Sequence, residues 1–133
     1  MNVSAMGNNK NQSEIVVLPE SDEKTLCVTL KGVVTLDDYK KRFYDRLKTI
    51  HEKNGGYNLL INYDESHKGW DKEAAEMSFQ SIIDVGKDAK KLAYVNAPDS
   101  KMLQVKISRP ILGGEIRFFE KDELDKAIKW IKA

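Results

Sequence analysis

The feature that most constrains this chain is a repeated switch between short β-prone runs and longer segments of helical periodicity. After the run KTLCVTL (24–30), the spacing of apolar residues changes from two to three or four. From Thr35, which can cap a first turn, the apolar residues fall on one side of a helix: Leu36, Tyr39, Phe43, Leu47 and Ile50. Strands alternating with helices predict an α/β domain.

The remaining runs complete an element order. EIVVL (14–18) and KTLCVTL are joined by the turn-forming PESDE, which predicts an antiparallel hairpin, and YNLLINY, KLAYVN and EIRFF are further strands. Helices fit residues 71–86 and a closing segment from Lys121. Residues 97–113 alternate partly like a strand, but a parallel crossover of this length usually contains a helix. We therefore expect β-β-α-β-α-β-α-β-α, an open mixed sheet of about five strands, antiparallel at its start and parallel in the remainder, with about four helices.

The predicted second helix has two contrasting sides. One side is apolar and is expected to face the core: Ala75, Phe79, Ile82 and Ile83. If helical geometry begins at Trp70, the opposite side carries Trp70, Ala74, Met77 and Ser81. An exposed Trp and Met would suit a protein partner or an apolar ligand. The alternative is that both sides of the helix are covered and these residues belong to the core.

Composition limits the function classes. Residues 1–13 are polar and rich in asparagine, which predicts a disordered tail or expression remnant before a single domain at 14–133. Lys and Arg number 22 against 21 Asp and Glu, so nucleic acid is not an expected partner. Without an apolar run of membrane-spanning length or a signal peptide, we expect no membrane insertion and a cytoplasmic location. The lone Cys27 in a strand is expected to be a buried hydrophobe.

The segment NYDESHKGWDK (62–72) resembles an active site in composition but not in spacing. Ser66 and His67 are adjacent, whereas a nucleophile and its base normally converge from separate segments. Asp64, Glu65, His67 and Asp71 offer metal-ligand atoms without the spacing of a zinc or iron motif, and His51 reads as a structural histidine. We therefore predict no catalytic residue, no metal site and no cofactor.

A binding role suits this segment better, because it leaves the carboxyl end of a predicted strand and enters a helix. Ligands of open α/β sheets collect at such ends. The predicted ligand-binding or partner-binding residues are Asp64, Glu65, His67, Trp70, Asp71 and Met77.

Six basic residues and Trp130 are predicted to have structural roles and not to form a binding site. A basic rim near the third helix would suit a phosphate or lipid headgroup, but a solvated face is preferred for Lys87, Lys90, Lys91, Lys101, Lys106 and Arg109. Trp130, three residues from Ala127 in the closing helix, is expected to be packed.

Four motifs carry a family resemblance. The segment KGVVTLDDYKKRF resembles the opening of SpoIIAA-like proteins, relatives of the STAS (sulfate transporter and anti-sigma-factor antagonist) domains. LLINYDESHKGWDKEAA is similar to their strand, acidic loop and glycine-tryptophan step, KKLAYVN to their fourth strand, and EIRFFEKDELDKAIKWI to their closing strand and helix. The resemblance spans roughly residues 14–132 and implies a STAS-like fold, distantly similar to the CRAL-TRIO (Sec14-like) lipid carriers.

The resemblance implies a non-enzymatic module that acts by binding. The favoured function is a regulatory domain that contacts a protein partner or a second copy of itself. The alternative is a small carrier or sensor of an apolar, lipid-like or anionic ligand, in a pocket between the second and third helices and the sheet; an enzyme is least favoured. STAS antagonists are phosphorylated on a serine at the start of the second helix, but here that entry reads Gly69, Trp70 and Asp71. The phosphorylation switch is therefore not transferred to Ser66.

Overall fold

A five-stranded mixed sheet forms the centre of the molecule. The computed structural model describes residues 14–133, and the predicted tail at 1–13 lies outside the described residues. The strand order is β1 (Glu14–Val17), β2 (Thr25–Lys31), β4 (Tyr57–Tyr63), β6 (Ala89–Val95) and β7 (Glu115–Phe119). β1 pairs antiparallel with β2 and every later pairing is parallel, which confirms the predicted mixed sheet.

The helices lie within the segments that were predicted to be helical. The first helical segment joins α2 (Leu36–Tyr39), a π-helical turn (Lys40–Tyr44) and α3 (Asp45–Asn54). The Thr35 hydroxyl accepts a hydrogen bond from the Asp38 amide at 3.3 Å, and Gly55 ends α3 with a φ of 70°. The next helices are α4 (Lys72–Val85), followed by a 3-10 turn (Gly86–Asp88), and α5 (Asp99–Ser108), followed by a second 3-10 turn (Arg109–Ile111).

Two of these assignments bear directly on the predictions. α5 confirms the helix expected within 97–113, because the parallel step from β6 to β7 requires a crossover. The closing helix α6 spans Leu124–Lys132 and so begins three residues later than expected.

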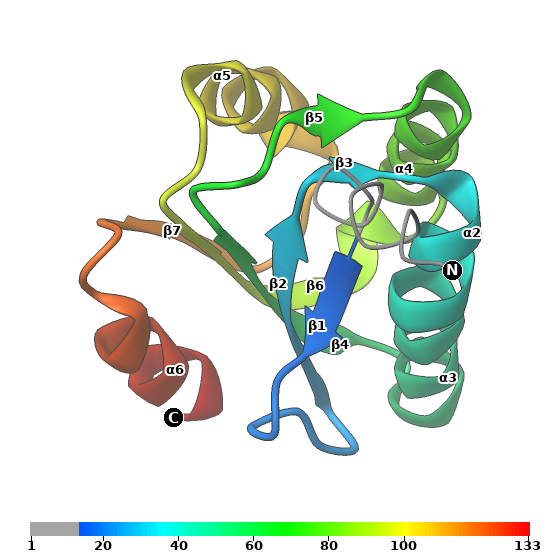
Figure 1. The fold of residues 1–133 in the computed structure, drawn as a ribbon. Helices are drawn as coiled ribbons and strands as arrows, with labels where there is room; N and C mark the ends of the chain where they lie inside the picture. Colours follow the sequence, from blue (N-terminus) through cyan, green and yellow to red (C-terminus); the bar gives the residue numbers. More distant parts are fainter. Residues whose placement is uncertain (1–13) are drawn as a thin grey trace.

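Helices lie on both sides of the sheet (Figure 1), and the two apolar cores that they cover differ in composition. α6 covers one face alone, over a compact cluster of small and aliphatic side chains: Cys27, Leu60, Ala93, Val95, Ala127 and Ile131. α2, α3, α4 and α5 belong to the other face, whose larger core contains four buried tyrosines: Tyr39, Tyr57, Tyr63 and Tyr94. Alternation along β4 explains the division, since Leu60 faces α6 while its neighbours Leu59 and Ile61 face the larger core.

A second, two-stranded sheet was not predicted. β3 (Val33–Val34) pairs in parallel with β5 (Gly69–Trp70), and the Lys68 and Asp71 amides donate to the carbonyls of Gly32 and Val34 at 2.8 and 2.9 Å. Two-residue strands carry almost no periodic signal, which is why the sequence did not reveal them. This pairing anchors the loop after β4 and holds Trp70 beside α2 and α4.

The expected orientation of α4 was wrong. Phe79 and Ile83 are 49% and 50% exposed, and Ala75 is also exposed, whereas Ala74 and Ser81 are buried. Trp70 and Met77 are half-buried and pack against the larger core, so the apolar surface expected at these two residues is not exposed.

Tyr39 provides the physical reason for this orientation. Its hydroxyl donates to the Ser81 hydroxyl at 3.2 Å, and its ring lies 5.6 Å from that of Trp70. Small residues at 74 and 81 allow α4 to approach α2 closely, and the Ser81 hydroxyl is satisfied by Tyr39 and by the Met77 carbonyl. The choice between the two sides therefore follows from the shape of a neighbour, not from the hydropathy of α4.

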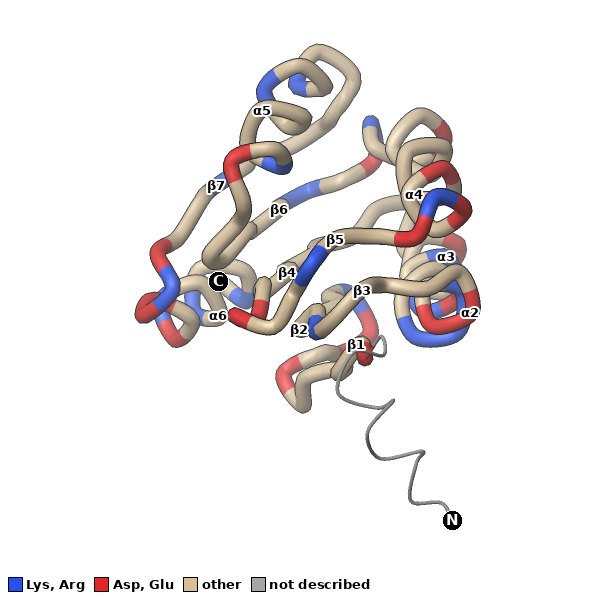
Figure 2. Tube along the Cα trace, turned by 45° about the horizontal axis from the view of Figure 1, so that its top comes forward, with Lys and Arg blue, Asp and Glu red and all other residues tan. Residues whose placement is uncertain are grey.

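Charged residues of both signs alternate over the helices, with no large region of one sign (Figure 2). The residues of the suggested basic rim do not share one environment: Lys87, Lys90, Lys106 and Arg109 are exposed, but Lys91 and Lys101 are partly buried. Lys91 donates to the carbonyls of Trp130 and Ala133 at 3.1 and 2.9 Å. Between residues 14 and 133, the helices lack the length and apolar character that crossing a membrane requires.

Candidate functional site

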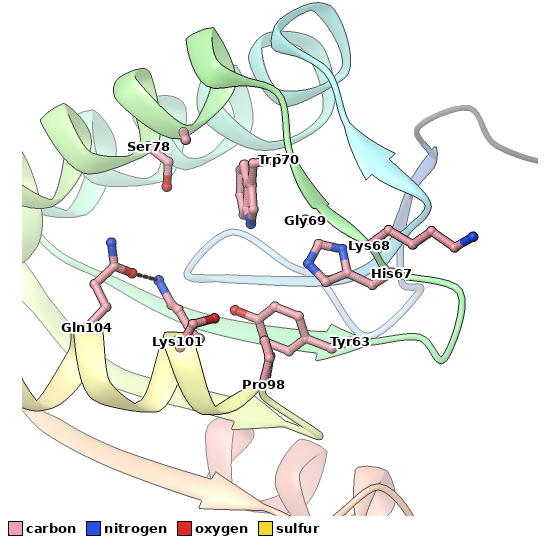
Figure 3. Close-up of a pocket in the computed structure, with 11 residues that line it drawn as sticks. Tyr63, His67, Lys68, Gly69, Trp70, Ser78, Pro98, Lys101 and Gln104 are labelled. Carbon is pink, nitrogen blue, oxygen red and sulfur yellow. Dashed lines mark hydrogen bonds between the residues drawn. The ribbon is translucent and has the colours of Figure 1, made fainter.

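A cavity of about 490 Å³ opens at the carboxyl end of β4, between β5, α4 and α5 (Figure 3). This is the end of a parallel strand at which open α/β sheets bind ligands, and the volume suits a small organic molecule. It also lies between the second and third helices and the sheet, where the carrier hypothesis had placed a pocket. The cavity is lined by Tyr63, His67, Lys68, Gly69, Trp70, Ala75, Ser78, Pro98, Ser100, Lys101 and Gln104.

Tyr63 brings a phenol to this cavity from the last position of β4. The residue is only 3% exposed, and within residues 14–133 its hydroxyl has no hydrogen-bond partner. Burial raises its pKa well above the usual value, so the phenol stays protonated at neutral pH. A buried hydroxyl without a partner costs about 1–3 kcal/mol, which is a reason to look for a ligand atom that would satisfy it.

His67 lies edge-on to Tyr63, with ring centroids 5.3 Å apart. Its Nδ1 is buried and has no hydrogen-bond partner among residues 14–133. Burial lowers the pKa of His67, and a hydrogen bond with the Gly32 backbone opposes that shift only in part. The imidazole is therefore held neutral, with one nitrogen free to accept a hydrogen bond.

Trp70 forms part of the opposite wall. Its ring packs edge-on against Tyr39, which fixes its orientation. Figure 3 shows the indole extending from β5 into the cavity, with its nitrogen directed toward the space between Tyr63 and Lys101. The indole N–H can only donate, so this wall offers an apolar surface together with one hydrogen-bond donor.

Lys101 enters from the first turns of α5. Its Nζ donates to the Gln104 Oε1 at 2.9 Å and lies 5.4 Å from the centroid of the Tyr94 ring. The residue keeps some exposed surface, but its amine is densely surrounded, and burial lowers its pKa from 10.5 to about 8. Among the described residues, 14–133, no acidic side chain lines the cavity.

Of the six residues predicted to bind a ligand or partner, the structure brings His67 and Trp70 together at the cavity. Asp64 instead accepts from the amide and hydroxyl of Ser66, at 3.0 and 2.6 Å, and these hydrogen bonds lower its pKa. Glu65 pairs with Lys121 on the surface.

The other two predicted residues also lie off the cavity. Asp71 is exposed at the start of α4, and Met77 packs against the core. Across residues 14–133 no three His, Cys, Asp or Glu side chains gather as metal ligands.

Sequence reasoning missed Tyr63 and Lys101. The position of Tyr63 at the end of a predicted strand was a usable signal, because ligands collect at such ends. Lys101 was counted with the surface lysines, since nothing in its local sequence distinguishes it from them. Its placement depends on α5 facing β5 across the cavity, which only the packed structure reveals.

The cavity is thus rich in hydrogen-bond donors and poor in acids. The Trp70 indole, the Tyr63 phenol and the Lys101 amine can all donate to one region, while the ring faces supply apolar contact. Such a lining suits a ligand with an oxygen acceptor at its head and an apolar body.

Comparison with known proteins agrees with this fold. The sequence model of the SpoIIAA-like family matches residues 25–132. The chain belongs to the SpoIIAA-like family. The crystal structure of an uncharacterised protein from Shewanella loihica, described as having a SpoIIAA-like fold, is similar with a TM-score of 0.64 and 21% sequence identity, covering 91% of this chain and 96% of that one. No match was found among curated proteins.

These comparisons show the family and the fold, and they support a broad kind of function at most. A SpoIIAA-like domain of this STAS-related type is a regulatory or binding module, and domains of this family commonly bind proteins. The fold is typically non-enzymatic. At 21% identity the Shewanella protein supports the fold alone.

Proposed function

We propose that this SpoIIAA-like protein is a non-enzymatic carrier or sensor of a small molecule with an apolar body and an oxygen-accepting head. The observation that carries the proposal is the cavity of about 490 Å³ at the end of β4, into which the Tyr63 phenol points with no hydrogen-bond partner among residues 14–133. The ligand head would accept from Lys101, Tyr63 and Trp70, and its body would lie against the ring of Trp70. A carboxylate and a carbonyl both satisfy this donor set.

Native mass spectrometry of freshly purified protein tests occupancy directly. We expect an extra mass that disappears on denaturation and reappears in an organic extract. The variant Trp70→Leu should lose this mass, whereas Trp130→Phe should retain it, because Trp130 packs beside Phe119 on the α6 side of the sheet.

A titration with octanoate covers the case of an empty protein. In the Trp130→Phe background, Trp70 is the remaining tryptophan and reports on the cavity. A saturable change in its fluorescence would support the proposal. The variant Lys101→Met should lower the affinity for octanoate at least about tenfold. Absence of both a co-purified ligand and saturable octanoate binding would refute it.

Self-association is a second candidate function, supported by a different observation. Several large apolar side chains on α4, on α5 and in the following turn are exposed: Phe79, Ile83, Leu103, Ile107 and Ile111. Such residues mark interaction surfaces when they are contiguous. Sedimentation velocity would detect a dimer, and Ile107→Ser should dissociate it because this side chain is 70% exposed and contributes little to the fold. A concentration-independent monomer would eliminate this candidate.

A further inference from the structure

Lys101 differs from Lys68, the other lysine of the cavity wall, because its amine faces the cavity, where no acidic side chain of residues 14–133 pairs with it. The Nζ donates to the neutral Gln104 amide, and within residues 14–133 no carboxylate oxygen lies within the 4.0 Å of an ion pair. Residues 1–13 contain no Asp or Glu that could supply one. A lysine that only stabilised the fold would be expected to pair with a carboxylate or to extend into water.

Burial changes the chemistry that this amine can perform. With a pKa of about 8, about one tenth of the Lys101 side chains are uncharged at pH 7, against roughly 0.03% for a lysine at 10.5. The uncharged amine is the nucleophilic form, and desolvated lysines are the ones that form Schiff bases with carbonyl compounds.

We propose that Lys101 captures an aldehyde or ketone ligand as a reversible imine inside the cavity. The inference rests on the proposed function and narrows its ligand to a small carbonyl compound with an apolar body. The carbonyl group enters between the Lys101 amine and the Tyr63 phenol, with its apolar part against Trp70.

The reaction requires no further reactant. The lone pair of the uncharged amine forms a bond to the carbonyl carbon, and the carbonyl π electrons move to oxygen, which takes a proton from nitrogen to give a carbinolamine. The lone pair of the carbinolamine nitrogen then forms the double bond to carbon as the hydroxyl leaves, and the proton remaining on nitrogen joins that hydroxyl, so that one imine and one water result. Tyr63 stays protonated and can donate to the carbonyl oxygen, which polarises the carbon for attack.

Neighbouring lysines serve as built-in comparisons. Lys68 borders the same cavity, but Figure 3 shows its side chain directed away from it. Lys106 lies on the same helix as Lys101 and is exposed. Selective reaction at Lys101 therefore cannot be attributed to helix α5 or to the presence of lysine alone.

Reductive trapping tests the proposal on the full chain. The protein is incubated with octanal and sodium cyanoborohydride at pH 7, and labelled lysines are identified by peptide mapping. We expect Lys101 to be labelled at least about tenfold faster than Lys106, and the preference to disappear in urea. Tyr63→Phe should slow labelling at Lys101 but not at Lys106.

Octanoate distinguishes a carbonyl site from a carboxylate site, because it shares the chain of octanal but cannot form an imine under these conditions. Binding of octanoate and binding of octanal are measured in parallel by Trp70 fluorescence in the Trp130→Phe background. Saturable binding of either probe with no preference for Lys101 in trapping would overturn the imine while leaving the proposed function intact. Failure of both probes to bind would overturn the imine, and if no co-purified ligand is found either, it would overturn the proposed function as well.

Discussion

The two faces of the sheet are formed by the same strands but differ in the side chains that they bury. On the α6 face, the buried core of the described residues consists of aliphatic side chains and Cys27, and it contains no tyrosine. On the face covered by α2 to α5, four tyrosines are buried, and the layer remains open between β5, α4 and α5. Aliphatic packing suffices for stability, whereas tyrosines bring polar atoms that need partners. The second face therefore combines packing with recognition, and the following predictions test that division.

The largest expected effect is on the α6 face. Leu60 is fully buried, so Leu60→Ala should lower the free energy of unfolding by about 2–5 kcal/mol. Octanoate affinity of the folded protein should not change, because Leu60 faces away from the cavity. Urea denaturation measures the loss, with Leu103→Ala as the control, since that side chain is 59% exposed and should cost less than about 0.5 kcal/mol. A weakened affinity in folded Leu60→Ala would show that the two faces are coupled.

The next effect is the pH dependence caused by Lys101 on the open face. Its folded pKa is lowered to about 8, so between about pH 8 and pH 10.5 the unfolded chain binds more protons at this site than the folded chain does. The penalty is complete below pH 8 and is relieved as the pH rises from about 8 toward 10.5. The wild type should therefore gain stability relative to Lys101→Met between pH 7 and 9.5.

Urea denaturation of the wild type and of Lys101→Met at several pH values measures this difference. The groups that face Lys101 are Gln104 and Tyr94, with His67 and Lys68 elsewhere in the cavity wall. Burial raises the pKa of Tyr94 and Tyr63, so neither ionises in the chosen range. A difference between wild type and Lys101→Met that does not vary with pH would mean that the amine is better solvated than its position indicates.

A smaller effect tests the orientation of α4. Met77→Ala should lower the free energy of unfolding by about 1–2 kcal/mol, because the half-buried side chain packs against the core. Phe79→Ala should cost less, although phenylalanine is the larger residue, because Phe79 is 49% exposed. Thermal or urea denaturation measures the loss of stability in each of the two variants. The reverse ranking would restore the orientation that hydropathy alone had predicted.

The smallest effect comes from one hydroxyl group. Tyr57 donates to the Val85 carbonyl at 3.1 Å, so Tyr57→Phe should cost about 1 kcal/mol. Tyr63→Phe removes a hydroxyl that has no partner among residues 14–133 and should leave stability unchanged or slightly higher, while octanoate affinity falls. Denaturation and Trp70 fluorescence measure the two properties separately. Equal destabilisation by both variants would indicate that the Tyr63 hydroxyl is structural.

Most of the fold was predictable from the sequence because its signals are local. Each strand of the five-stranded sheet is a short apolar run, and Thr35 and Gly55 mark the ends of the first helical segment. The site was predictable only in part. The loop after β4 was predicted from its position, and its residues His67 and Trp70 line the cavity, whereas the acids of that loop do not. Other partners hold these acids, since Asp64 bonds within its own turn and Glu65 pairs with Lys121 on the surface.

The sequence by itself determined the order of elements, the mixed sheet and the SpoIIAA-like family. Tertiary structure decided which side of α4 is buried and which lysine lies beside an unpaired tyrosine. Periodicity shows that a helix has an apolar side, but the side that meets the core depends on the neighbouring surface, here the ring of Tyr39 against Ala74 and Ser81. The burial of a charge depends likewise on elements distant in the chain, as Lys101 on α5 faces Trp70 on β5 only after folding.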